Sequence, residues 1–553
     1  MLLASWAATS RAIDLEAAKA RYAEIVASEL ARDIAPGVSV AWIVDGETVH
    51  AAGYGLADRR AGTAATADTI YRAGSISKLF NAVAAMQLVE QSKLDLDAPI
   101  EQALPEFRIV VPFPDARPIT ARQLLCHRSG MIRESPVGGY LDNRQPTVQA
   151  TIASVADCVL VNPPDTKTRY SNVGPTIVGR AIEVQTGRDY FDYQQQHILG
   201  PLGMASSAWR MNDALRPRLA KGEMRVACGN GIYCYEPAPE FELGTLPTGN
   251  LYTTASDLAR FASFVIGNTS GSQSSPQLIK RESLEKMLAV QLTNEGTGFG
   301  LAFGVNRYRG HKTAQHMGAV YGFTTSIVVL PEERIGVVVL SNADIAIAPV
   351  RRLSDAALDL LLDAVRGQTA PKPPQPVDLN GEDLAKFFGD YESESYWART
   401  FVEHGKLHCL LSGQKLELIP TGPAKFLADG RMMAQSEFEF QRSDDGTVGE
   451  LKAAGQTFHR VDPSKVAAAP AGWQRLLGSY GLRFIPLIVS IRHGHLYASV
   501  ENEYDYRLTP VNRVTFALPS GMYSDEQIVF QEDASGNVAG VVMANMYLPR
   551  RDD

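Results

Sequence analysis

A proline-rich stretch divides this chain and most constrains how it can fold. Positions 371–376 hold four prolines, a composition that favours a stiff, extended linker over a helix or strand. The chain has 553 residues, which is more than one hydrophobic core usually supports. We therefore expect a large unit over residues 1–370, the linker at 371–376, and further domains beyond it.

The unit before the linker mixes helical and strand patterns. Residues 15–31 have helical periodicity, and residues 350–366 have it again before Gly367, a helix-ending residue. Strand-forming residues occur in two closely spaced pairs of runs. The first pair is 38–43 and 47–53, and the second is 324–330 and 335–340. This pattern predicts an α/β (α+β) domain in which helices flank an antiparallel sheet.

The chain beyond the linker is predicted to be all-β and internally repeated. Short alternating segments are separated by turn pairs such as Asp429-Gly430. One motif occurs twice, as Phe388-Gly389-Asp390-Tyr391 and again as Leu477-Gly478-Ser479-Tyr480. The two copies lie farther apart along the chain than the about 20–50 residues that separate solenoid repeats. We expect two small, lipocalin-like antiparallel β-barrels, over residues 377–465 and 466–553.

Charge and composition exclude several classes of partner. A net charge of −8 disfavours nucleic acid, and no run of about 18 apolar residues is present to span a membrane. Five cysteines are too few for a disulfide framework in a chain of this length, although a disulfide between Cys228 and Cys234 is left open. No CxxC or HxxxH spacing accompanies these two cysteines, which argues against a zinc site there. We expect a soluble protein, cytoplasmic or periplasmic, that needs no metal or organic cofactor.

One serine stands out as a candidate nucleophile. Ser75 and Lys78 lie three residues apart at the start of a predicted helix, so the amine can reach the hydroxyl. The backbone N–H groups of a helix N-terminus can also stabilise a developing oxyanion. The same spacing occurs at 283–286 and 412–415, so it does not identify a nucleophile by itself.

Two further motifs follow in order, and each occurs once. Tyr170 is the only one of 20 tyrosines with Asn two residues later, and His316 is the only one of 10 histidines with Gly two residues later. Together with Ser75, they resemble the SxxK, YxN and KTG/HxG motifs of the serine β-lactamase and penicillin-binding-protein superfamily. The resemblance covers roughly residues 15–366 and includes the segments 71–74, 119–130 and 249–258.

The resemblance implies a mechanism and a set of site residues. Ser75 would form an acyl-enzyme, with Lys78 and Tyr170 sharing the proton transfers. Asn172 would orient Lys78 and bind the substrate amide, and the N–H groups of Ser75 and Ala319 would form the oxyanion hole. His316 and Gly318 complete the predicted site. His127 is left out, because it follows an apolar helix and is expected to bond to backbone.

The third motif and the two barrels bear on the substrate. Histidine is mostly neutral at pH 7, whereas the lysine of the KTG motif is positively charged. His316 would therefore attract a substrate carboxylate less strongly than that lysine. The HxG form resembles the esterases and D-aminopeptidases of the superfamily, and the D-aminopeptidases also carry two barrels. We expect a serine peptidase or amidase for short or D-residue-containing peptides, including linearised cyclic peptides.

Other functions stay open. A carboxylesterase of the same superfamily would use the same residues on an ester, and a β-lactamase or a catalytically silent peptide-binding module ranks lower. The expected partner is a small peptide, amide or ester substrate. The sequence does not decide whether the protein forms a homodimer.

Overall fold

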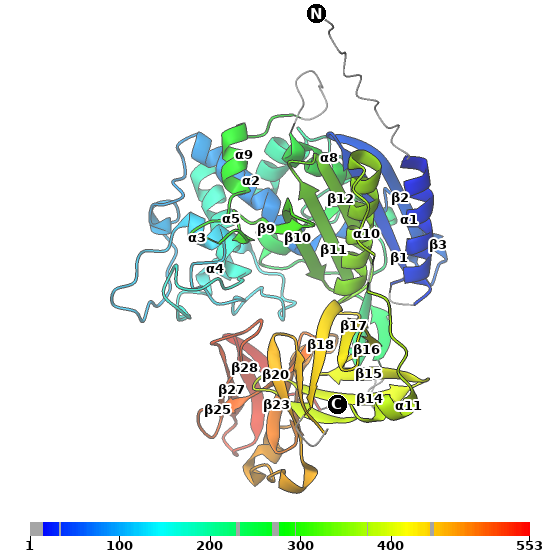
Figure 1. Cartoon of the computed structure of the whole chain (residues 1–553). Helices are drawn as coiled ribbons and strands as arrows, with labels where there is room; N and C mark the ends of the chain where they lie inside the picture. Colours follow the sequence, from blue (N-terminus) through cyan, green and yellow to red (C-terminus); the bar gives the residue numbers. More distant parts are fainter. Residues whose placement is uncertain are drawn as a thin grey trace, which may run out of the picture.

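The N-terminal domain is built on one antiparallel sheet (Figure 1). The computed structural model describes residues 15–32, 35–227, 233–267, 276–293, 295–372, 374–442 and 447–552. Cys228 lies outside these residues, so a disulfide with Cys234 stays open. Eight strands run in the order β3-β2-β1-β12-β11-β10-β9-β8. Their bounds are β1 (Gly37–Val44), β2 (Glu47–Asp58), β3 (Thr63–Ala64), β8 (Gly298–Phe299), β9 (Gly304–Tyr308), β10 (His311–Val320), β11 (Phe323–Leu330) and β12 (Ile335–Ser341).

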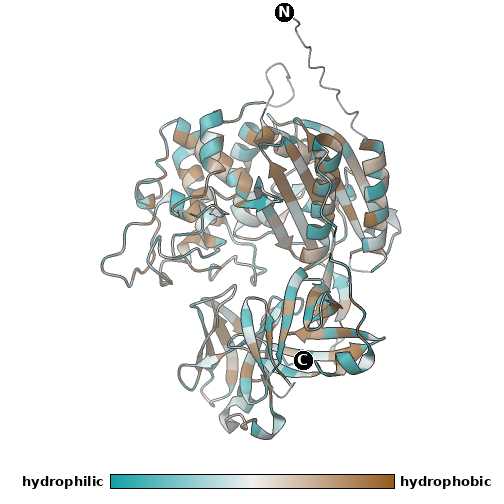
Figure 2. Cartoon of the chain, viewed as in Figure 1, coloured by the Kyte–Doolittle hydropathy of each residue, from teal (hydrophilic) through white to brown (hydrophobic). Residues whose placement is uncertain are grey.

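Both predicted strand pairs are confirmed, and the central strands are covered on both faces. Asp45 and Gly46 turn β1 into β2 with φ of 53° and 87°, as a tight Asp-Gly hairpin requires. Every residue of β1, β11 and β12 is buried, and apart from small hydroxyl residues such as Ser39 and Thr325 these strands are apolar (Figure 2).

Helices cover the two faces of the sheet. Helices α1 (Leu15–Leu30) and α10 (Ile347–Arg366) pack on one face, around Tyr22 and Trp42. Helices α2 (Ser77–Glu90), α5 (Val173–Thr186) and α8 (Ala255–Ile266) belong to the core on the other face. Gly367 ends α10 with φ of 65°, the predicted left-handed cap. No described helix is long and apolar enough to cross a bilayer.

The first β-rich unit beyond the linker is a closed barrel with its own core, which we call the first barrel. Its hydrophobic core includes Phe387, Phe426 and Phe440 and is separate from those of the N-terminal domain. Its strands are β13 (Gly389–Glu392), β14 (Trp397–Glu403), β15 (Lys406–Leu411), β16 (Gln414–Pro420), β17 (Lys425–Gly430), β18 (Ala434–Arg442), β19 (Val448–Ala453) and β20 (Gln456–Arg460).

The last unit, which we call the second β unit, forms two antiparallel sheets. A bridge between Tyr480 and Arg550 joins its first strand to its last segment. One sheet holds β21 (Gly478–Tyr480), β22 (Leu487–Arg492), β23 (His495–Val500) and β24 (Tyr504–Arg507). The other holds β25 (Thr509–Pro510), β26 (Thr515–Ala517), β27 (Gln527–Glu532), β28 (Val538–Met543) and β29 (Met546–Pro549).

The sequence repeat marks the same closing corner in both units. The Tyr391 hydroxyl donates to the Phe387 carbonyl at 3.0 Å, and the Tyr480 hydroxyl donates to the Leu476 carbonyl at 2.7 Å. Tyr391 pairs with Arg460 just as Tyr480 pairs with Arg550. The repeat is therefore structural, while the domain boundaries at 370/371, 376/377 and 465/466 stay predictions.

The two C-terminal units attach to the N-terminal domain differently. The hydrophobic core of the second β unit is continuous with that of the N-terminal domain, and Phe484 packs 5.4 Å from Tyr321 between ring centres. The first barrel is held by polar contacts instead, such as Arg352 to Asp429 at 2.7 Å. Among the residues that the structure describes, it is the second β unit whose hydrophobic core joins that of the domain with the predicted site.

Candidate active site

Ser75 lies in a short 3-10 turn, Gly74–Ile76, that leads directly into α2. This helix is buried on nearly all sides, so its N-terminus is fixed inside the domain. The Ser77 hydroxyl donates to the Gly74 carbonyl at 2.6 Å and accepts from the Leu251 N–H at 3.1 Å. These bonds hold the turn that presents Ser75.

Lys78 is fully buried and its amine has three partners. Lys78 Nζ lies 2.9 Å from Ser75 Oγ, 2.7 Å from Asn172 Oδ1 and 3.1 Å from the Thr248 carbonyl oxygen. Burial holds the pKa of Lys78 well below its usual value, because the charged form is poorly solvated there. A lysine with a lowered pKa can accept a proton at neutral pH.

Tyr170 lies against the same pair of groups. Its hydroxyl is hydrogen-bonded to Ser75, and its ring centre is 4.9 Å from Lys78 Nζ. Burial raises the pKa of Tyr170 to about 12, although the Ser75 hydrogen bond opposes this effect. Tyr170 therefore carries its proton at neutral pH. His127, buried behind it at 4.3 Å between ring centres, accepts a hydrogen bond from the Ser171 backbone N–H.

Glu134 orients the amide of Asn172. The Asn172 amide nitrogen donates to one Glu134 oxygen, and the Tyr140 backbone N–H donates to the other at 3.1 Å. With its nitrogen bound to a carboxylate, Asn172 must turn its oxygen toward Lys78. Burial raises the pKa of Glu134 to about 7. Sequence reasoning missed Glu134.

The HxG segment reaches Ser75 because two glycines let the backbones approach. A Cβ on Gly318 would lie 2.0 Å from the Ala73 carbonyl oxygen, and one on Gly74 would lie 2.8 Å from the Ala319 nitrogen. Side chains at either position would push β10 away from the Ser75 turn. The glycines therefore bring the Ala319 N–H close to the turn that holds Ser75.

His316 is buried in β10 and uncharged. Its Nδ1 bonds to the Met317 carbonyl at 2.6 Å, and burial lowers its pKa to about 4. It does not line the cavity at Ser75, whereas Met317, Gly318 and Ala319 do.

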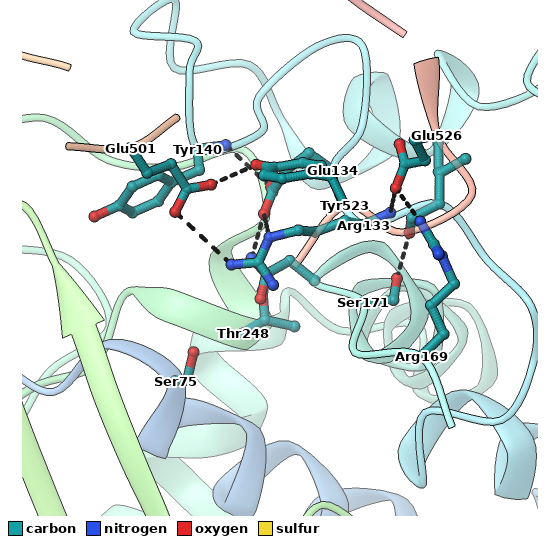
Figure 3. A network of polar contacts seen from close by, with 12 residues as sticks. Ser75, Arg133, Glu134, Tyr140, Arg169, Ser171, Thr248, Glu501, Tyr523 and Glu526 are labelled. Atoms are coloured by element: carbon teal, nitrogen blue, oxygen red, sulfur yellow. Dashed lines mark hydrogen bonds and ion pairs between the residues drawn. The ribbon is translucent and has the colours of Figure 1, made fainter. Parts of the chain in front are cut away.

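Ser75 opens into a cavity of about 180 Å³ that the second β unit helps to close. Glu501 and Glu503, between β23 and β24, line it together with Arg133 of the N-terminal domain. Figure 3 shows Glu501 contacting both Arg133 and Tyr523 above Ser75, with Arg169 bound to Glu526 beside them. A larger cavity of about 490 Å³ contains none of the predicted site residues.

Comparison with known proteins identifies the family. The family description "Beta-lactamase" matches residues 23–362, more than half of the chain. The chain belongs to the Beta-lactamase family.

Members of this family are serine hydrolases, and relatives of the chain extend beyond the family domain. A protein named penicillin-binding protein 4 from Amycolatopsis lactamdurans is 29% identical over 65% of this chain and 93% of its own length. An unguisins hydrolase from Aspergillus campestris is 26% identical over 77% of this chain and 87% of its own.

Solved structures share the fold. An octameric penicillin-binding protein homologue from Pyrococcus abyssi is 26% identical, with a TM-score of 0.57 over 80% of this chain and 99% of that one. A D-amino acid amidase from Ochrobactrum anthropi, at 23% identity and a TM-score of 0.53, covers 64% of this chain and 99% of its own, and shows the fold alone.

The structure brings the predicted residues of this Beta-lactamase family chain together and adds others. Ser75, Lys78, Tyr170 and Asn172 meet in one network, with Gly318 and Ala319 beside it. Glu134 had a weak signal, as a charged pair with Arg133 directly after the apolar Met131-Ile132. Glu501 and Glu503 had none, because no motif connects them to the Ser75 region.

Proposed function

We propose that this protein is a serine amidase or peptidase that cleaves small substrates through an acyl-enzyme on Ser75. The observation that carries the proposal is the 2.9 Å contact between Ser75 Oγ and the buried amine of Lys78. A serine hydroxyl is a weak nucleophile unless a base takes its proton. Lys78 has both the position and the lowered pKa that this task needs.

In the first step, Ser75 Oγ attacks the substrate carbonyl carbon while its proton passes to Lys78. The carbonyl oxygen becomes an oxyanion that accepts from the N–H groups of Ser75 and Ala319. Tyr170, which is protonated at neutral pH, donates a proton to the leaving amine as the C–N bond breaks, and Lys78 reprotonates Tyr170. Water then releases the acyl group by the same transfers in reverse.

Two observations favour an open-chain amide over a β-lactam as the substrate. The unguisins hydrolase resembles this chain over most of both sequences, which supports a hydrolase acting beyond antibiotics. His316 is neutral, and the cavity wall carries Glu501 and Glu503, so a substrate carboxylate near the scissile bond gains no cation from the HxG segment. A carboxylesterase remains the second candidate, because the same groups serve an ester.

The test is hydrolysis of a small panel by wild type and Ser75→Ala. The panel holds D- and L-amino-acid amides, short peptides, p-nitrophenyl butyrate and nitrocefin. Release of amine that depends on Ser75 supports the amidase, and cleavage of the butyrate ester alone moves the protein to the esterases. A fluorophosphonate adduct on Ser75, detected by mass spectrometry, reports the nucleophile independently of substrate choice.

A further inference from the structure

Tyr170 and Asn172 lie on one short segment of the N-terminal domain, residues 169–172, which directly precedes α5. A second segment, which carries Glu134, lies beside it. The Asn172 N–H donates to the Arg133 carbonyl at 2.8 Å, and Glu134 accepts from the Asn172 amide nitrogen. The two segments are therefore joined, and a shift of either would move the side chains that contact the nucleophile and its base.

A loop of the second β unit bonds to both segments. This loop, residues 518–526, connects β26 to β27. Its Glu526 carboxylate accepts from the Arg169 guanidinium and, at 3.3 Å, from the Arg133 backbone N–H, as Figure 3 shows. Each of these arginines stands directly before a residue of the site. One carboxylate thus connects the second β unit to both segments.

The contact between Glu526 and Arg169 is buried. Only 5% of Glu526 and 8% of Arg169 is exposed. Arg169 also donates to the Ser524 carbonyl with its guanidinium and, at 2.7 Å, to the His127 carbonyl with its backbone N–H. Burial raises the pKa of Glu526, but the positive charge of Arg169 favours its ionised form. The arginine is therefore held at both ends, and so is the start of the segment that carries Tyr170.

The loop itself is fixed within the second β unit. The Glu526 N–H donates to the Tyr523 carbonyl at 3.1 Å, and the Leu518 N–H donates to the Glu526 carbonyl at 3.0 Å. The buried Tyr523 ring lies 5.3 Å from the Arg133 guanidinium, which lies 5.5 Å from the Tyr170 ring on the other side. A loop held in this way can fix the position of the segments that it contacts.

We propose that Glu526 is a positioning residue for the reaction at Ser75. Through the two arginines it holds the segments that set Tyr170 and Asn172, although it does not itself line the Ser75 cavity. This inference rests on the proposed function, because it assigns a support to the groups that transfer protons there. A displacement of about 1 Å at such groups can cost about 100-fold in rate, so the support matters without touching the substrate.

The experiment removes the contact and then restores an acceptor. Glu526→Ala removes the acceptor, whereas Glu526→Gln keeps one of the same size. The substrates are D- and L-alanine p-nitroanilides, whose amine is free, and their N-acetyl counterparts. In Glu526→Ala, kcat should fall about 10- to 100-fold for each anilide that wild type cleaves, while KM changes little, because alignment is lost and the cavity lining is kept. Glu526→Gln should recover most of kcat.

Lys167→Gln is the matched control. Lys167 pairs at 3.0 Å with Asp525 of the same loop, but the two side chains are 59% and 44% exposed. Exposed ion pairs contribute little, so this variant should leave kcat and KM unchanged. The inference is overturned if Glu526→Ala keeps the wild-type kcat, if KM rises while kcat is unchanged, or if Lys167→Gln lowers kcat as much as Glu526→Ala does.

Hydrogen exchange gives a readout that does not depend on activity. In Glu526→Ala, peptides that cover residues 169–173 should exchange faster than in wild type, while peptides of the first barrel keep their rate. If the loss of one charge unfolds this variant, the double variant Arg169→Met/Glu526→Leu replaces it, because removing both charges leaves no uncompensated charge. The double variant should show the same fall in kcat, and wild-type kcat in it would overturn the inference.

Failure of the proposed function gives a different result. If wild type cleaves p-nitrophenyl butyrate but no anilide, the amidase proposal is wrong, and kcat for the ester is compared in the same variants with the same expectation. If wild type shows no hydrolysis that depends on Ser75, the proposed function as a whole is wrong. Hydrogen exchange then decides whether Glu526 holds the segment: faster exchange over residues 169–173 supports this role, and unchanged exchange overturns it.

Discussion

The two sides of the active-site cavity come from different parts of the chain. The catalytic floor, Ser75 with Lys78, Tyr170 and Asn172, belongs to helices and loops packed on the N-terminal sheet. The acidic wall, Glu501 and Glu503, lies between β23 and β24 of the second β unit. This difference separates the groups proposed to break the bond from the acids on the opposite side of the cavity, so changes on the two sides should have different effects.

The largest effect is expected at Lys78. Lys78→Ala should lower kcat/KM by about 10² to 10⁴ for every substrate, the usual contribution of a positioned base. Lys78→Arg should not restore activity, because a guanidinium stays protonated. Steady-state kinetics on free-amine and N-acetyl anilides measure both variants. A loss of kcat/KM confined to free-amine substrates would contradict the idea that the floor and the wall have different roles.

A smaller effect on all substrates is expected at Glu134. Glu134→Gln keeps an acceptor for Asn172 but removes a negative charge that raises the pKa of Lys78. We expect kcat/KM to fall about 10-fold through weaker alignment. Because Lys78 then loses its proton more easily, the acidic limb of the pH profile should move to lower pH.

The pH profile distinguishes this positioning role from a merely structural one. A variant that only destabilises the fold would lower activity without moving the limb. A limb that moves to higher pH would contradict the assigned coupling between Glu134 and Lys78.

The smallest effect is expected at Gln414, which supports the wall from the first barrel. Gln414→Ala removes the donor to the Glu503 carbonyl, so Glu503 should be held less closely. We expect kcat/KM for the anilides to fall about threefold, within the worth of one hydrogen bond, with the rate of fluorophosphonate labelling of Ser75 unchanged. Glu437→Ala, an exposed position on the same barrel, serves as the control. An equal loss in the rate of Ser75 labelling would instead indicate that Gln414 stabilises the floor around Ser75.

The floor could be predicted from the sequence, and the wall could not. Lys78 follows Ser75 by one helical turn, so local geometry brings them together, and the paired motifs at Tyr170 and His316 supplied the rest through the family resemblance. The central strands were also predictable, because β1, β11 and β12 consist mostly of apolar and β-branched residues.

Glu501 and Glu503 reach Ser75 only because the second β unit packs against the N-terminal domain through Phe484 and Tyr321. That contact depends on the docking of two folded surfaces, and no local periodicity encodes it. Glu134 is an intermediate case, because the sequence shows a charged pair with Arg133 beside apolar residues but not the contact between Glu134 and Asn172.

The shared closing corner of the two β units points to an internal duplication. Counted from that corner, the Ser412-Gly413 turn after β15 and the Glu501-Asn502 turn after β23 occupy equivalent places, and all four residues have left-handed φ of 44° to 89°. The two turns also touch, through Gln414 and Ser412. After such a duplication, the turn of the first barrel could be kept as a structural support for the other. The turn of the second β unit could then diverge and acquire acidic residues that face Ser75, a residue that lies in neither copy.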